Sequence, residues 1–396
     1  MLELIINRSE QEETICLVEN GKLIEKYQNN DNTRHNRLEG NIYAGKIADI
    51  VPGMQSAFID YGDKKKGLMY FKDAIPRINE VNNDKKLDYN TDIRKVLKSE
   101  QKILIQIKKD CNDKKGAKVS THITIPSRYI AFMPNTDIIT ISQKITNEKR
   151  KNELLELAKN NISKGNGLVI RTIAENVEDS EIIKDIERCT KKWNNILEKY
   201  KTSNLTDLIY SAESIQEKIV LDLKLDKIIT NSKEEFEKMK KILQEEEIKN
   251  VKLELKVTNN LLDLYELENQ INKTKERKIW LNCGGFITID KTEALTAIDV
   301  NTGKFTGSKD LEATVFKVNK EATREIARQL RLRDIGGIVI IDYIDMKKQE
   351  NKDEIEEMLK QELKKDRAKT QVEGFTKLNL IEMTRKHICS HLDEEV

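Results

Sequence analysis

The stretch from Gly284 to Met346 constrains the fold more than any other part of this chain. It opens with an alternating apolar segment that ends at Asp299. Apolar residues then recur every three or four positions from about residue 310 to residue 333, which predicts an amphipathic helix. A glycine pair ends that helix, and the apolar run Ile338–Ile341 predicts a strand buried on both faces. The stretch is therefore expected to form a strand, a helix and a second strand.

The two predicted strands end in acidic residues, Asp299 on the first and Asp342 on the second. A strand–helix–strand unit joins parallel strands, whose C-terminal ends share the edge of the sheet where α/β proteins bind ligands. If the strands are neighbours, the two carboxylates converge, and Asn301 lies on the face of Asp299 because strand side chains alternate. Carboxylate and amide oxygens suit Mg²⁺ or Mn²⁺ better than zinc, and such an ion can polarise a phosphate and activate water.

A purely structural role for these aspartates is the alternative. Aspartates at strand ends often only cap the next turn or helix, and for Asp299 or Asp342 alone that interpretation is favoured. The presence of both in one crossover, with Asn301 and a further acid at Asp345, favours a metal site instead.

The two runs GGFITIDKTEALTAIDVNTGKFTG and REIARQLRLRDIGGIVIIDYIDM resemble the catalytic region of the bacterial ribonuclease E/G family. The resemblance implies that Asp299 and Asp342 hold a catalytic Mg²⁺ and that Asn301 supports the site. It also implies the reaction, which is endonucleolytic hydrolysis of single-stranded RNA to 5′-phosphate and 3′-hydroxyl ends, in RNA processing and decay. The residues alone predict a divalent-metal phosphate site, and the resemblance adds RNA as the substrate.

The fold class implied by the resemblance is α/β and multidomain. It comprises a mixed α/β catalytic core, made of an RNase H-like and a DNase I-like subdomain, with an inserted OB-fold barrel and an α/β 5′-sensor region. The expected boundaries are 1–35 for the N-terminal strands of the RNase H-like subdomain, 36–125 for the barrel, 126–215 for the sensor, 216–279 for the rest of the RNase H-like subdomain, and 280–396 for the DNase I-like catalytic subdomain.

Three local patterns make further predictions. Asn20 and Gly21 stand between alternating apolar runs, which is the strongest short signal for a hairpin. The apolar spacing from Asp263 to Arg277 predicts one helix, and the run from Thr376 to Glu382 predicts a last strand.

Residues 36–125 alternate apolar and polar positions between short turn signals, which predicts a small β-barrel. The segment Gly40–Lys46 fits part of a phosphate-loop pattern, but isoleucine follows the lysine and the lysine lies within a strand pattern, so that interpretation is rejected. An OB barrel binds single strands with aromatic residues and a basic groove. The candidates here are Phe58, Tyr61, Tyr70 and Phe71, with Lys64, Lys65, Lys66, Lys108, Lys109, Lys114, Lys115 and Lys118. Core aromatics and an ordinary solvated loop are the alternative. The resemblance assigns RNA contacts to Phe58 and Lys109, whereas Leu68 replaces a second aromatic contact.

Arg171 and Thr172 follow a predicted strand and enter a polar loop. An arginine fork beside a hydroxyl suits a phosphate monoester, but from the sequence alone an exposed strand-end arginine is the favoured interpretation. The resemblance implies that this pair forms a 5′-phosphate sensor, which favours RNA carrying a 5′-monophosphate.

Composition excludes a membrane protein and a disulfide scaffold. Hydrophobic residues make up 38% and charged residues 35% of the 396 residues, and no apolar run approaches the roughly 20 residues of a membrane helix. The N-terminus shows no secretory signal, and the five cysteines are scattered without a CxxC pair, so a cytoplasmic location is expected.

The segment HICSHLDEEV stands where the family usually continues into a CPxCxG zinc motif and a small dimerisation domain. His387, Cys389 and His391 form an incomplete ligand set, so no zinc is expected in this chain. Oligomerisation is possible, but the zinc-linked form of the family is not carried over.

The expected function is therefore a Mg²⁺-dependent endoribonuclease, with single-stranded RNA as its partner. The main alternative is a non-catalytic RNA-binding protein of the same family, against which the complete set of Asp299, Asn301 and Asp342 argues. A phosphatase of small phosphomonoesters would use the same metal chemistry but leaves the barrel unexplained.

Overall fold

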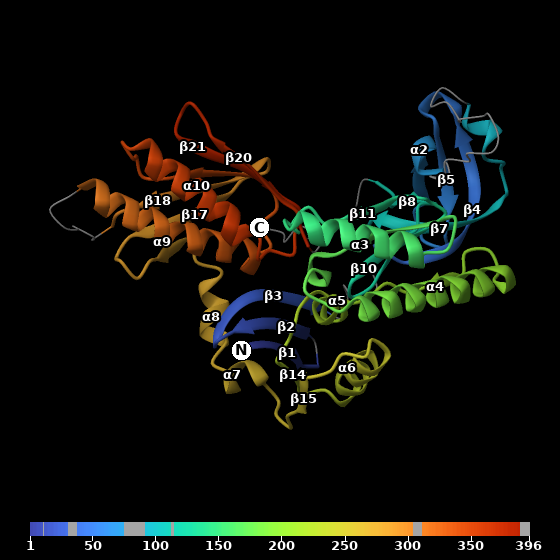
Figure 1. Cartoon of the computed structure of the whole chain (residues 1–396), viewed down its shortest axis with the longest axis horizontal. Coiled ribbons are helices and arrows are strands. Elements are labelled where there is room, and N and C mark those ends of the chain that lie inside the picture. The colour runs from blue at the N-terminus through green and yellow to red at the C-terminus, as the bar shows by residue number, and fades with distance from the viewer. Residues whose placement is uncertain (11, 31–37, 75–91, 112–114, 304–310, 389–396) are drawn as a thin grey trace. The chain divides into compact units, whose positions relative to one another are not determined.

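A computed structural model of the chain describes residues 1–10, 12–30, 38–74, 92–111, 115–303 and 311–388 (Figure 1). The chain divides into two compact units, Met1–Asp31 with Lys224–Val396, and Asn32–Leu223. The first unit holds two β-sheets, and the second holds a barrel and a smaller sheet.

The N-terminal sheet of the first unit has the strand order β15-β14-β1-β2-β3. Its strands are β1 (Leu2–Arg8), β2 (Glu12–Glu19), β3 (Lys22–Asn30), β14 (Lys227–Thr230) and β15 (Lys252–Leu255), and its helices are α6 (Lys233–Glu245), α7 (Leu261–Leu264) and α8 (Glu268–Lys273). The predicted hairpin is confirmed, because Asn20 and Gly21 join β2 to β3 with φ of 50° and 78°.

The single helix predicted from Asp263 to Arg277 is wrong, because the chain breaks between α7 and α8. Glu266 has a φ of 53°, which no α-helix accommodates. The break lets the apolar residues Leu261, Leu267 and Ile271 all pack into one core with the N-terminal strands, and this burial outweighs helix continuity.

The second sheet of the first unit, called the C-terminal sheet below, has the order β16-β17-β18-β19-β21-β20. Its strands are β16 (Lys278–Trp280), β17 (Phe286–Lys291), β18 (Leu295–Asn301), β19 (Gly337–Asp342), β20 (Thr370–Phe375) and β21 (Leu380–Arg385). Strands β18 and β19 pair in parallel, and the other neighbours are antiparallel. The last strand, predicted from Thr376 to Glu382, runs from Leu380 to Arg385, because a turn occupies the positions just before Leu380. Strand β20 was not predicted.

Both long helices, α9 (Leu311–Leu332) and α10 (Gln349–Leu363), pack on the same face of the C-terminal sheet (Figure 1). Val318 and Ile326 of α9 share a core with Ile298 and Ile341 of the strands. The other face is uncovered in the described part of the unit, where the side chain of Ile338 is 48% exposed. The prediction that residues 338–341 are buried on both faces is therefore wrong. The sheet has helices on one side only, so alternate side chains of β19 face outward.

The barrel of the second unit closes in the order β4-β5-β6-β8-β7, with β7 pairing back onto β4. Its elements are β4 (Ile42–Val51), η1 (Pro52–Met54), β5 (Ser56–Asp60), β6 (Gly67–Tyr70), α2 (Phe71–Ala74), η2 (Ile93–Lys95), β7 (Lys102–Lys109) and β8 (Lys118–Ser120), with β13 (Leu208–Tyr210) pairing onto β4. Lys46 lies within β4, which agrees with the rejection of a phosphate loop. An α/β multidomain fold with an inserted OB-fold barrel is confirmed.

The smaller sheet of this unit has the order β11-β12-β10-β9. Its elements are β9 (Ile125–Pro126), β10 (Ile130–Pro134), β11 (Ile139–Ile141), α3 (Glu148–Asn161), β12 (Asn166–Ile170), η3 (Thr172–Ala174), α4 (Asp179–Thr202) and α5 (Ile215–Asp222). The long helix α4 buries Ile186, Cys189 and Trp193 against this sheet, so Trp193, which is only 5% exposed, belongs to the core.

A buried ion-pair network holds the end of β21. The side chain of Arg385 is fully buried and donates to Asp366 (Nε–Oδ2 2.8 Å), to Asp334 (Nη1–Oδ1 2.8 Å) and to the carbonyl of Ile335 (2.9 Å). Arg385 therefore holds the end of β21 in place. Its guanidinium is too deeply buried to contact a phosphate.

We expect Arg385→Met to lower the free energy of unfolding of the first unit by about 3–5 kcal/mol, because it removes a buried cation that pairs with two buried carboxylates. Urea unfolding followed by circular dichroism measures this change. The neighbouring exposed Lys386→Met is the control and is expected to shift stability by less than about 0.5 kcal/mol. A similar small shift for both variants would contradict the role given to Arg385.

Candidate active site

The parallel register of β18 and β19 brings two acidic residues side by side. Asp299 stands directly opposite Asp342, at the C-terminal ends of the only parallel strand pair in the described part of the C-terminal sheet. Both side chains are exposed. Their sequence neighbours Ile298, Val300 and Ile341 point the other way, into the core under the helices. The two carboxylates therefore share the uncovered face of the sheet, about one strand spacing (roughly 4.8 Å) apart in the backbone.

The charges of this pair oppose one another. The pKa of Asp342 is raised by partial burial and then by the negative charges of Asp299 and Asp345. Asn301 lies on the same face and donates from Nδ2 to Oδ2 of Asp299 at 2.6 Å, which fixes that carboxylate. Asp345 accepts a long hydrogen bond of 3.4 Å from Asn379. A cation between the two carboxylates would relieve this repulsion.

The donor atoms at this place suit a hard cation. They are carboxylate oxygens with an amide close by, and the described residues contain no group of three or more His, Cys, Asp or Glu side chains placed to hold a metal. A site with only two carboxylates matches the way proteins hold Mg²⁺, which keeps several waters and takes further oxygens from substrate phosphates.

Buried polar residues of α9 hold the segment that follows Asp342. Asn319 is fully buried, donates from Nδ2 to the carbonyl of Ile344 (2.8 Å) and accepts the Ile344 amide N–H (3.2 Å). Thr323 shares a 2.9 Å hydrogen bond with the hydroxyl of Tyr343, whose pKa is raised by burial. Sequence reasoning missed these positioning residues. The signal was present, since an asparagine and a threonine interrupt the apolar stripe of the predicted helix.

The predicted sensor residues lie together at the end of β12 in the second unit. Arg171 donates from Nη1 to the carbonyl of Ser127 (2.6 Å) and forms an ion pair with Asp222 through Nη2. Thr172 is exposed and shares a 2.8 Å hydrogen bond with the hydroxyl of Ser142. The guanidinium is therefore oriented by Ser127 and Asp222.

The predicted RNA contacts of the barrel fall in one row of paired residues. Phe58 pairs with Leu68, Leu68 with Lys118, and Lys118 with Lys109. Phe58 is half-buried and Lys109 is exposed, so the row has a partly exposed aromatic residue at one end and a cation at the other.

Two of the other barrel aromatics have a different role. Tyr61 is 2% exposed and Phe71 is 4% exposed, so both belong to the barrel core and cannot stack on bases. Tyr70 remains on the surface, with the ammonium of Lys118 at 5.8 Å from its ring centre. The structure places Lys64, Lys65, Lys66 and Lys115 on the surface, whereas Lys114 lies outside the described residues.

Comparison with known proteins decides the family. The model of the Ribonuclease E/G family matches residues 124–388. Ribonuclease G of Escherichia coli (strain K12) is 35% identical over 390 residues, which cover 97% of this chain and 79% of the relative. The chain belongs to the ribonuclease E/G family.

Other relatives agree with this assignment. Ribonuclease G of Haemophilus influenzae is 35% identical over 398 residues, covering 99% of this chain and 81% of the relative. Ribonuclease E of Buchnera aphidicola is 33% identical over 407 residues, covering 100% of this chain but 41% of that longer protein. The family is one of metal-dependent nucleases, and the oxygen donors at Asp299 and Asp342 are compatible with such an ion.

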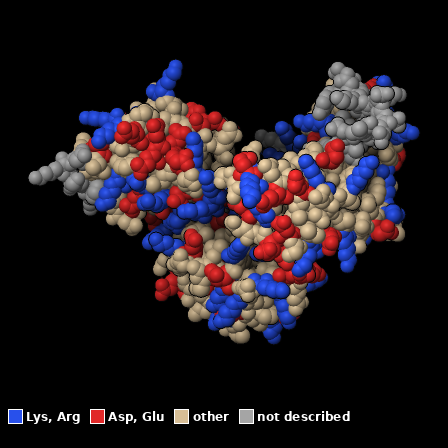
Figure 2. Space-filling model, viewed as in Figure 1, with Lys and Arg blue, Asp and Glu red and all other residues tan. Residues whose placement is uncertain are grey.

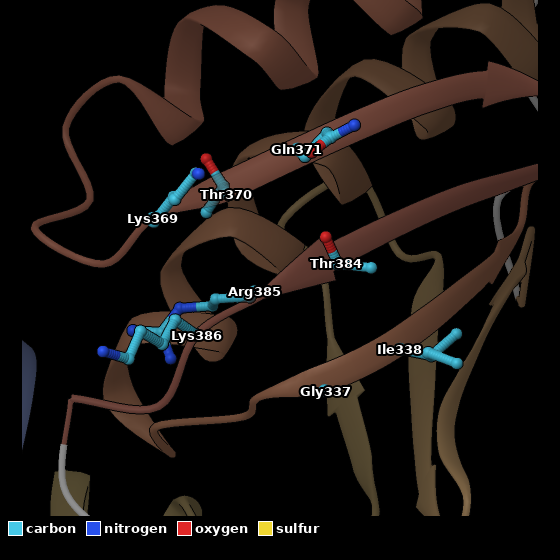
Figure 3. Close-up of a pocket in the computed structure, with 8 residues that line it drawn as sticks. All are labelled: Gly337, Ile338, Lys369, Thr370, Gln371, Thr384, Arg385 and Lys386. Atoms are coloured by element: carbon cyan, nitrogen blue, oxygen red, sulfur yellow. The ribbon is translucent and has the colours of Figure 1, made fainter. Parts of the chain in front are cut away.

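A cavity of about 410 Å³ opens at the start of β19, the end opposite the carboxylates, and is lined by Gly337, Ile338, Lys369, Thr370, Gln371, Thr384, Arg385 and Lys386 (Figure 3). It contains no acidic lining residue and is distinct from the candidate site.

No helix in the described ranges is long and apolar enough to span a bilayer.

Near the C-terminus, His387 contacts the Asp334 carbonyl through Nδ1 at 2.9 Å and packs against Gly336. Its predicted companions Cys389 and His391 lie outside the described residues.

We expect Asn319→Leu to lower kcat about tenfold with little change in KM, since the segment behind Asp342 loses its anchor without loss of any substrate contact. The two backbone groups of Ile344 also lose a partner, which costs about 1–3 kcal/mol of stability. Kinetics on single-stranded RNA and urea unfolding measure the two effects. Asn194→Leu, at an exposed position of α4, is the matched control, and equal kinetics for both variants would contradict the anchoring role.

Proposed function

We propose that this chain is a Mg²⁺-dependent endoribonuclease that hydrolyses single-stranded RNA to 5′-phosphate and 3′-hydroxyl ends, with Mn²⁺ as a possible substitute ion. The observation that carries the proposal is the direct register of Asp299 with Asp342 on an uncovered sheet face, in a chain of the ribonuclease E/G family. An RNA nuclease of this kind would act in the cytoplasm, where its substrates are made.

Asp299 and Asp342 would hold the ion, and Asn301 holds the Asp299 carboxylate in place through its 2.6 Å hydrogen bond. When bound, such an ion supplies Lewis-acid polarisation of the phosphate and lowers the pKa of water. The protein fixes the position of the two carboxylates in two ways. The register of β18 with β19 sets them opposite each other, and the buried Asn319 holds the segment that follows Asp342. It also contributes an uncovered face onto which an extended RNA strand can lie.

Charge distribution argues against RNA binding on the helical face of the sheet. Figure 2 shows acidic side chains gathered over α10, whose sequence QENKDEIEEMLKQEL carries more acidic than basic residues. An acidic helix repels the phosphate backbone.

The remaining parts of the chain have supporting roles in this proposal. Residues 36–125 form the RNA-binding barrel, with Phe58 stacking on a base and Lys109 contacting the backbone. Residues 126–215 form the sensor, 280–396 the catalytic subdomain, and 1–35 with 216–279 its structural support. Arg171 and Thr172 would bind the terminal monophosphate through the guanidinium and the hydroxyl.

Cleavage of a 5′-monophosphorylated single-stranded RNA tests the reaction. We expect the parent chain to cut only with Mg²⁺ or Mn²⁺, and Asp299→Asn to lose a factor of about 100 or more in kcat/KM, because one charged ligand is lost. Asp353→Asn, on helix α10 of the opposite face, is the control and should cut like the parent. RNA binding without metal-dependent cleavage by the parent would favour a non-catalytic RNA-binding protein instead.

The preference for a 5′-monophosphate tests the sensor separately. We expect the parent to cut 5′-phosphorylated RNA about tenfold faster than 5′-hydroxyl RNA, since a charge-assisted hydrogen bond contributes about 1.5–3 kcal/mol. Arg171→Gln should remove this ratio and leave cleavage of the 5′-hydroxyl RNA unchanged. Lys159→Gln, an exposed cation on α3, should keep it. An unchanged ratio in Arg171→Gln would contradict the sensor assignment.

A further inference from the structure

The face that carries the carboxylates extends to the edge of the C-terminal sheet through two rows of paired residues. In one row Asp299 stands opposite Thr288, and Thr288 opposite Lys278. In the next, Asn301 stands opposite Phe286, and Phe286 opposite Trp280. Paired residues in neighbouring strands point to the same face, and no bulge interrupts these pairings. Lys278 and Trp280 therefore share the face of Asp299 and Asn301. Lys278 lies two strands from Asp299, and Trp280 two strands from Asn301, each at roughly 10 Å in the backbone.

Trp280 is held in a fixed orientation but left open to solvent. Its indole meets Phe286 edge to face, with ring centres 5.3 Å apart, yet the residue remains 53% exposed. Gly303 passes beside it with a φ of 59°, where an added Cβ would lie 3.3 Å from indole Cζ3. The indole is thus positioned on one side by its neighbours and offers the rest of its surface outward.

Lys278 completes the arrangement with a positive charge. Its ammonium lies 4.2 Å from the centre of the Trp280 ring and 3.6 Å from that of Phe286. No carboxylate of the described residues lies within 4.0 Å of it, so its charge is not neutralised by an ion pair there. An edge-strand lysine also discourages pairing with other strands, but that role does not account for an exposed, oriented indole beside it.

We propose that Trp280 and Lys278 form a nucleotide subsite of the active site. The indole stacks on a base of single-stranded RNA close to the phosphate that is cut, and the Lys278 ammonium binds a neighbouring backbone phosphate. Aromatic stacking with an adjacent cation is the usual way in which proteins hold single strands, because every base has a π-face and every nucleotide a charge. This subsite rests on the proposed function, since it assigns RNA to the face that bears Asp299 and Asp342.

Intrinsic fluorescence tests the subsite without requiring cleavage. The chain contains two tryptophans, and the other, Trp193, is buried in the second unit. A single-stranded RNA oligonucleotide is titrated in the absence of divalent cations, with binding followed independently by anisotropy of labelled RNA. We expect the RNA to quench the parent and to leave the emission of Trp280→Phe unchanged, although that variant still binds. RNA that binds but changes the emission of both proteins equally would overturn the proposal.

Kinetics with abasic substrates separate stacking from a merely structural role. Removal of one base near the cleavage site should lower kcat/KM of the parent about tenfold, in line with the strength of base–aromatic stacking. Trp280→Ala should lose about tenfold on intact RNA and nothing further on that abasic RNA, and Trp280→Phe should restore most of the loss. Ile338→Ala, similarly exposed at the far end of the same face, is the control. Losses in Trp280→Ala that are equal at every abasic position would overturn the proposal.

Lys278→Gln gives a further readout. The slope of log affinity against log salt should become shallower by about 0.7, the value expected when one single-strand phosphate contact is lost. An unchanged slope would remove Lys278 from the subsite.

The outcomes distinguish this subsite from the proposed nuclease function. Quenching through Trp280 without metal-dependent cleavage would leave the subsite and remove the nuclease. Metal-dependent cleavage that is unchanged when Trp280 or Lys278 is replaced would leave the nuclease and remove the subsite. Failure of the parent to bind single-stranded RNA at all would remove both.

Discussion

The parallel pairing of β18 with β19 is the constraint on which the rest of the candidate site depends. It exists because the chain crosses over through α9 between the two strands, and it sets Asp299 opposite Asp342. A shift of one residue in this register would turn one of the carboxylates into the apolar core. The buried residues on either side of the aspartates pack under α9 and α10. A register shift would expose them to water, and no surface contact could offset the cost of that exposure.

Placing both helices on one face has a functional consequence. A sheet covered on both sides would bury the strand ends and leave access only at the edge, whereas this sheet presents whole rows of side chains. The carboxylate pair, Asn301, and the edge residues Lys278 and Trp280 all belong to those rows. An extended polymer can contact several such rows at once, which a small phosphomonoester cannot.

The sequence predicts local patterns well and long-range partners poorly. The crossover, the hairpin at Asn20 and the barrel are predicted because periodicity and turn chemistry are local. One-sided burial of β19 is not predictable from a continuous apolar run, since it depends on where α10 packs. The same limit applies to Tyr61, which looks like a stacking aromatic and lies in the barrel core, and to Arg385, whose partners Asp334 and Asp366 are distant in the chain. Residue roles in catalysis came from the resemblance to a family, because spacing alone does not separate a ligand from a cap.

Binding of Mn²⁺ to the chain, followed by electron paramagnetic resonance, tests most directly whether Asp299 and Asp342 converge on one ion. The register predicts that Asp299→Asn and Asp342→Asn each weaken the binding strongly, and that the double variant binds little worse than either single one, because both remove the same site. Independent, additive losses, or single variants that bind Mn²⁺ as the parent does, would contradict a shared carboxylate site.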